Sequence, residues 1–201
     1  TYQGSSRFYA RNSSGNYEMD TGELRRAFLS SVEGARGIKD LHAKAVAEGA
    51  IGENMPVVLP RHQPIAIMTI APQAVLRDVR DLAITSMDDA AFAPKHDGTI
   101  NWSLGLDGFV VHAPYGSDPT RCQGWAFTRR RGYVDFGWRI GEKQENQNLV
   151  FPSLFYPVFA NAAEDAQAVL QRHGLEGPWV VMVTLIRVAG YVLPIGNKQA
   201  W

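Results

Sequence analysis

The stretch Gly124-Trp-Ala-Phe-Thr-Arg-Arg-Arg-Gly-Tyr-Val-Asp-Phe-Gly-Trp-Arg139 decides the fold class of this chain. Along residues 132–140, apolar and polar side chains alternate with the period of two that a β-strand gives. One face takes Val134, Phe136, Trp138 and Ile140, and the other takes Tyr133, Asp135 and Arg139. The same alternation assigns Trp125 and Phe127 of the preceding strand to the core. The three arginines between the two strands mark a tight turn, so the stretch predicts a β-hairpin.

The flanking sequence extends this hairpin into a sheet. Residues 107–114 carry the apolar run Phe-Val-Val and predict a strand that precedes 123–128, which makes a three-stranded meander with 132–140. Residues 65–72 predict a buried strand. Residues 179–193 contain Val-Val-Met-Val-Thr-Leu-Ile, an apolar run typical of a central strand.

Three further segments predict helices. Residues 24–49 carry apolar residues at steps of three and four, although Gly34 and Gly37 predict a bend or a break there. Residues 74–82 predict a short helix, and residues 154–173 predict the clearest one, which ends at Gly174. Helices and strands in this order predict an α+β fold, a mainly antiparallel sheet covered by helices.

The first residues predict a strand followed directly by a helix. Arg7, Tyr9 and Arg11 alternate with apolar neighbours, which is typical of a strand with one solvent-exposed face. Residues 12–16 are rich in turn formers, and Asp20 with Glu23 forms a capping box before the first helical run. A strand that opens at residue 5, without an initiating Met, predicts a piece of a longer protein.

This opening resembles the end of the Schlafen AlbA-type domain of bacterial proteins, in which a Phe-Tyr-x-Arg-x-(Ser/Gly) strand precedes a helix. The matching positions are Arg7, Phe8, Tyr9, Arg11, Asn12, Ser13, Gly15, Glu23, Leu24 and Phe28. The resemblance implies contact with nucleic acid and, in some members, nuclease activity. The acidic catalytic positions of those members lie upstream of this strand, so nuclease activity is not carried over. The resemblance divides the chain into the end of an AlbA-type domain (1–20), a connecting helix (21–50) and a C-terminal α+β domain (51–201).

Composition narrows the function classes. Lys plus Arg and Asp plus Glu number 20 each, so any contact with nucleic acid must come from a local basic patch. The single cysteine, Cys122, excludes an intrachain disulfide and favours a reducing, cytoplasmic compartment. No apolar run approaches the ~20 residues that span a bilayer, so no membrane partner is expected. The five histidines are scattered without metal-ligand spacing, and we expect neither a metal nor a cofactor.

Two clusters of arginines are the candidate nucleic-acid-binding residues. Arg129, Arg130 and Arg131 lie at the predicted turn with Tyr133 beside them, a combination suited to phosphate contact and base stacking. The alternative interpretation is an exposed turn that keeps the hairpin soluble and its edge unpaired. Arg7, Arg11, Arg25 and Arg26 form the second cluster, around the opening strand and the start of the helix. For Arg25 and Arg26 the alternative is an ordinary solvated helix face.

The chain carries no phosphate-binding glycine loop and no nucleophile elbow, and its loop carboxylates are typical turn formers. The sequence therefore favours a non-catalytic, nucleic-acid-associated accessory domain, with DNA or RNA as its partner. The alternative is a ligand-sensing domain, or one that forms a homo-oligomer or binds a partner protein through its sheet or its 154–173 helix.

Overall fold

The structure, a computed structural model, describes residues 9–12, 15–76, 81–94, 99–143 and 147–194. The chain forms two compact units, residues 1–37 and residues 38–201. The division falls inside one continuous helix, α1 (Thr21–Ile51), so the second unit begins with the last turns of that helix. Helix α1 continues through Gly34 and Gly37, so the expected alternative of a break into two helices is wrong.

The first unit contains a small hairpin before α1. Strands β1 (Tyr9–Asn12) and β2 (Gly15–Glu18) pair antiparallel, so a second strand, and not yet the helix, follows β1. Residues 13–14 of the predicted turn lie outside the described residues. The predicted capping box is confirmed: the Glu23 backbone N–H donates to Asp20 Oδ1 at 2.7 Å, and the Asp20 N–H donates to Glu23 Oε2 at 3.0 Å.

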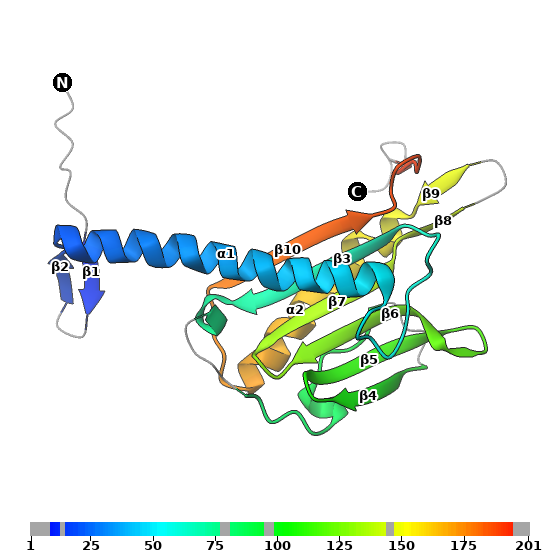
Figure 1. Cartoon of the computed structure of the whole chain (residues 1–201), viewed down its shortest axis with the longest axis horizontal. Helices are drawn as coiled ribbons and strands as arrows, with labels where there is room; N and C mark the ends of the chain where they lie inside the picture. The colour runs from blue at the N-terminus through cyan, green and yellow to red at the C-terminus, as the bar shows by residue number, and fades with distance from the viewer. Residues whose placement is uncertain (1–8, 13–14, 77–80, 95–98, 144–146, 195–201) are drawn as a thin grey trace. The chain divides into compact units, whose positions relative to one another are not determined.

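The second unit is built on a six-stranded antiparallel sheet (Figure 1). Its strands are β3 (Ile65–Pro72), β4 (Asn101–Gly105), β5 (Gly108–Tyr115), β6 (Asp118–Arg129), β7 (Tyr133–Arg139) and β10 (Trp179–Ile186), in the order β10-β3-β7-β6-β5-β4. A two-stranded sheet of β8 (Gly141–Lys143) and β9 (Asn148–Val150) accompanies it. The predicted α+β class with a mainly antiparallel sheet is confirmed. The meander has four strands rather than the predicted three, since the short strand β4 precedes β5 and pairs with it.

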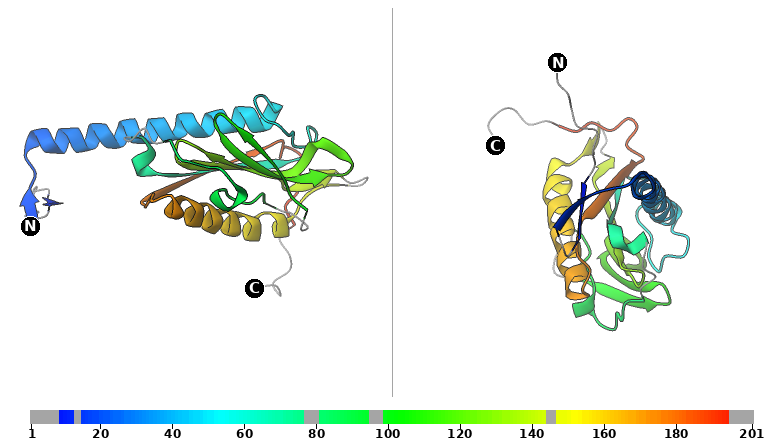
Figure 2. Two further views of the ribbon diagram at one scale, coloured as in Figure 1. Left: turned by 90° about the horizontal axis from the view of Figure 1, so that it is seen from below. Right: turned by 90° about the vertical axis from the view of Figure 1, so that its left-hand side faces the viewer.

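Helices cover the two faces of this sheet (Figure 2). The C-terminal helix α2 (Tyr156–Arg172), predicted as 154–173, packs on the face that carries Val134, Phe136 and Trp138. On the opposite face, Ala45 of α1 packs in one cluster with Trp125 and other residues of the sheet. The two faces are therefore both buried, which is why β3 and β7 consist almost entirely of buried residues.

Strand β10 lies at the edge of the sheet, although its apolar composition predicts a central position. It pairs with β3 alone and ends the sheet, whereas the apolar run predicts a central strand. Its alternate residues Val181, Val183 and Leu185 are 40%, 36% and 42% exposed. The prediction of a central position is wrong because an uncharged run shows only that a strand is suited to burial, not which neighbours it has.

Short 3-10 helices complete the unit: η1 (Gln73–Leu76), η2 (Met87–Asp89) and η3 (Pro152–Leu154). Of the predicted helix at 74–82, the structure shows only η1 at its start; residues 77–80 lie outside the described residues, and residues 81–82 are not helical.

Candidate ligand-binding cleft

The arginine turn joins β6 to β7 by residues 130–132. Arg129 pairs with Tyr133 across the hairpin, and Gly132 adopts a positive φ of 93°. This conformation favours glycine, and a Cβ here would also lie 2.8 Å from the Cδ1 atom of Leu175, which would have to shift. The Arg130 backbone is fixed on two sides: its N–H donates to Asp107 O at 3.0 Å, and its C=O accepts from the Leu82 N–H at 2.7 Å.

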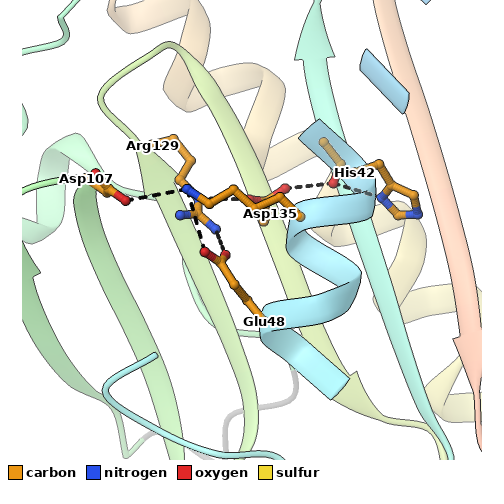
Figure 3. A network of polar contacts seen from close by, with 7 residues as sticks. His42, Glu48, Asp107, Arg129 and Asp135 are labelled. Carbon is orange, nitrogen blue, oxygen red and sulfur yellow. Dashed lines mark hydrogen bonds and ion pairs between the residues drawn. The ribbon is translucent and has the colours of Figure 1, made fainter. Parts of the chain in front are cut away.

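Arg129 points into the protein, not into solvent. It is the last residue of β6 and lies two positions after Phe127, so both side chains fall on the sheet face that α1 covers. Its Nε donates to Asp135 Oδ2 at 2.8 Å, and its Nη2 donates to Glu48 Oε2 (Figure 3). Its guanidinium carbon also lies 3.6 Å from the centre of the Phe127 ring. The guanidinium, 3% exposed, is thus occupied by two buried carboxylates and an aromatic ring.

The network continues across the sheet to His42 of α1. The Thr69 hydroxyl donates to Asp135 Oδ1 at 2.7 Å, so it must accept from His42 Nδ1, which lies 2.9 Å away. The His42 Nε2 is then left to accept from the Thr184 hydroxyl of β10, also at 2.9 Å. Burial lowers the pKa of His42, which agrees with this neutral tautomer.

Burial also shifts the pKa values of the charged groups in this network. It raises the pKa of Asp135, against the opposing effect of the nearby Arg129 guanidinium. Burial alone would lower the pKa of Arg129, but the carboxylates of Asp135 and Glu48 outweigh it and raise that pKa. Burial raises the pKa of Tyr133 to about 12. The guanidinium therefore keeps its charge, and Tyr133 remains a neutral phenol.

A cleft of about 890 Å³ opens beside this network. It is lined by α1, the β4–β5 turn, the β6–β7 turn and Asp81; its side chains include Leu41, Lys44, Leu104, Leu106, Asp107, Arg129, Arg130, Arg131 and Tyr133. The Lys44 ammonium lies 3.6 Å from Asp107 and 3.7 Å from Glu48, which links the cleft to the buried network. The Arg130 Nη1 donates to Leu82 O at 3.1 Å, while Arg131 is exposed.

The structure thus separates the predicted binding residues. All four residues of the first cluster line the cleft, but Arg129 and Tyr133 are only 3% exposed, so the expectation that they are exposed is wrong. Arg7 lies outside the described residues, as do the side chains of Arg11 and Arg26, while Arg25 is exposed, so the second cluster stays a prediction. Sequence reasoning missed Lys44, Asp107 and Leu106, for which no motif gives a signal. The strand period, however, places Arg129 on the same covered face as Phe127.

Among the described residues, no group of three or more His, Cys, Asp and Glu side chains is arranged to hold a metal ion. No helix in that part of the chain combines the length and apolar character needed to cross a membrane.

No protein-family model, curated protein or solved structure matches this chain.

Proposed function

We propose that residues 38–201 form a non-catalytic ligand-sensing domain, whose cleft binds a small anionic molecule with an apolar body. The observation that carries this proposal is the lining of the 890 Å³ cleft. Lys44, Arg130 and Arg131 offer cations to an acidic group, whereas leucines from α1 and the β4–β5 turn line the same space. Ligand sites of this size commonly combine an apolar wall with a few placed charges.

The charge of the cleft favours a small ligand. Arg129 is already paired with the carboxylates of Glu48 and Asp135, so its charge is not available to a ligand. Three basic and two acidic side chains remain in the lining, and Lys44 pairs with Asp107 and with Glu48, so Arg130 and Arg131 are the main cations left for a ligand. Two such cations suit a ligand with a single carboxylate, sulfonate or phosphate group.

Binding of 1-anilinonaphthalene-8-sulfonate, an aromatic sulfonate of this description, tests the proposal by fluorescence titration of the folded chain. Removing an ion-paired donor costs about 1.5–3 kcal/mol, so Arg131→Ala or Lys44→Ala should weaken binding about 10- to 100-fold. Arg61→Ala is the matched control, because Arg61 is exposed and lies outside the cleft. Unchanged affinity in Arg131→Ala and Lys44→Ala, or an equal loss in Arg61→Ala, would refute the proposed site.

The second candidate function is contact with a DNA or RNA phosphate in the cytoplasm, as part of a Schlafen AlbA-type protein. Its support is the opening motif together with the gathering of Lys44, Arg130 and Arg131 at one cleft. Affinity for a fluorescent single-stranded oligonucleotide should fall with salt. The double replacement Arg130→Ala/Arg131→Ala should reduce the magnitude of the salt slope by about 0.7 for each phosphate that the variant no longer binds.

Arg129 must stay in place in this experiment. Removing Arg129 leaves the buried carboxylates of Glu48 and Asp135 without their cation and destabilises the fold. A loss of binding would then not distinguish unfolding from the loss of a contact in the cleft. Binding that is insensitive to salt, or that survives the double replacement unchanged, rejects nucleic acid as the partner of this cleft.

A further inference from the structure

Strand β10 carries the composition of a central strand at the edge of the sheet. Its eight residues, Trp179-Val-Val-Met-Val-Thr-Leu-Ile186, contain no charge, proline or glycine. It pairs with β3 residue for residue over its whole length, without a bulge. Proteins normally protect an edge strand with a charge, a proline, a bulge or a very short strand. None of these devices is present in β10.

The nearest arginine is also held away from this edge. Arg187, directly after the strand, donates from its guanidinium to the carbonyls of Ala50 and Pro60. Among the described residues, no strand pairs with the outer side of β10. The edge therefore offers backbone N–H and C=O groups together with the exposed strip of Val181, Val183 and Leu185.

We infer that β10 pairs antiparallel with β10 of a second copy of this chain, which joins the two sheets into one. A strand without charges meets no electrostatic repulsion from its own copy. In a register centred on Val183, this residue faces its symmetry mate and Val181 faces the partner's Leu185, so the exposed strip becomes continuous. Pairing of β10 with itself closes after two copies, whereas pairing with the other edge strand, β4, would leave free edges and propagate.

The length of the strand sets the expected affinity. Eight residues extend over about 26 Å. The surface area that two paired strands of this length bury is smaller than the roughly 1,200 Å² of a stable interface. We therefore expect a dimer that exchanges with the monomer at micromolar concentrations. This inference concerns a different part of the fold from the cleft and is independent of the proposed ligand.

Light scattering during size exclusion of the full chain, loaded over a range from low to high micromolar concentration, tests the dimer. The mass should rise from 22.2 kDa toward twice that value. Val183→Lys places like charges opposite each other and should raise the dissociation constant about 100-fold. Leu106→Lys, the same change at a 97% exposed position outside β10, should leave it unaltered. A monomeric mass throughout, or equal losses in both variants, overturns the inference.

Crosslinking provides a second measurement, which does not require the strand to fold with a lysine at position 183. Val183→Cys introduces one exposed thiol, since the native Cys122 is fully buried and burial raises its pKa to about 12. Facing Cβ atoms of antiparallel strands approach disulfide range in non-hydrogen-bonded pairs, and a short bis-maleimide crosslinker spans the hydrogen-bonded ones. Mild oxidation should yield a covalent dimer of Val183→Cys and none of Leu106→Cys. Val181→Cys and Leu185→Cys test the registers centred on those two residues. If all three cysteine variants fail to crosslink, the pairing of β10 with itself is overturned.

Discussion

Replacement of Arg129 by Met should destabilise the fold by about 4 kcal/mol at pH 7. The change removes the donors to Asp135 and Glu48, which are 0% and 4% exposed, and leaves both carboxylates buried. Breaking a buried pair by removing one partner costs about 3–5 kcal/mol. Asp135 keeps its bond from Thr69, which holds the expected loss below the upper limit. A loss of this size is a large share of the ~5–15 kcal/mol that stabilises a typical domain.

Urea unfolding monitored by tryptophan fluorescence measures this loss. With a slope of about 2 kcal/mol per M, the midpoint should fall by about 2 M. Arg131→Met is the matched control, because Arg131 is exposed, and its effect should stay within about 0.5 kcal/mol. A triple variant, Arg129→Met with Glu48→Met and Asp135→Asn, should recover most of the stability, since it leaves no unpaired buried charge. A loss below about 1 kcal/mol in Arg129→Met would refute the assignment of Arg129 to a buried network.

Two further predictions concern pH and packing. Burial lowers the pKa of both His42 and His112 below the ordinary value of 6.5. As the pH falls, the histidines therefore bind protons in the unfolded chain before they do so in the folded one. The stability present above pH 6.5 should accordingly be lost as the pH falls from 6.5 through the lowered pKa values. His112→Leu should flatten this loss by up to about 1.4 kcal/mol per pH unit in urea midpoints measured from pH 7 to 5, and an unchanged slope would contradict a buried neutral His112. Gly137→Ala should cost about 1–3 kcal/mol, because its Cβ would lie 2.5 Å from the Trp125 ring. Gly105→Ala, where the nearest atom is 3.8 Å away, should cost less, and equal thermal midpoints for the two variants would contradict this close packing.

The parts of the fold that follow a local period could be predicted from the sequence. Residues 65–72, 132–140 and 154–173 became β3, β7 and α2, because each carries one unbroken pattern of its own. Strand β4, Asn-Trp-Ser-Leu-Gly, was missed because five residues with two glycine or asparagine positions give little signal. The edge position of β10 could not be predicted, since strand order depends on pairing between segments more than one hundred residues apart in sequence.

The roles of the residues in the candidate site also could not be predicted from local sequence alone. Three adjacent arginines have the same local sequence context, yet the structure gives them different roles. The strand period turns Arg129 toward the face that α1 covers, and only the carboxylates of Glu48 and Asp135, supplied by α1 and β7, make this burial possible. Arg130 and Arg131 follow after the strand ends and are free of that constraint. The buried arginine therefore fixes α1 against the sheet, and through Glu48 and Lys44 this same helix forms one wall of the cleft. Arg129 therefore affects a ligand chiefly through the wall that α1 forms, so in binding assays its variants should be compared with Lys44→Ala, whereas Arg131→Met remains the control for stability.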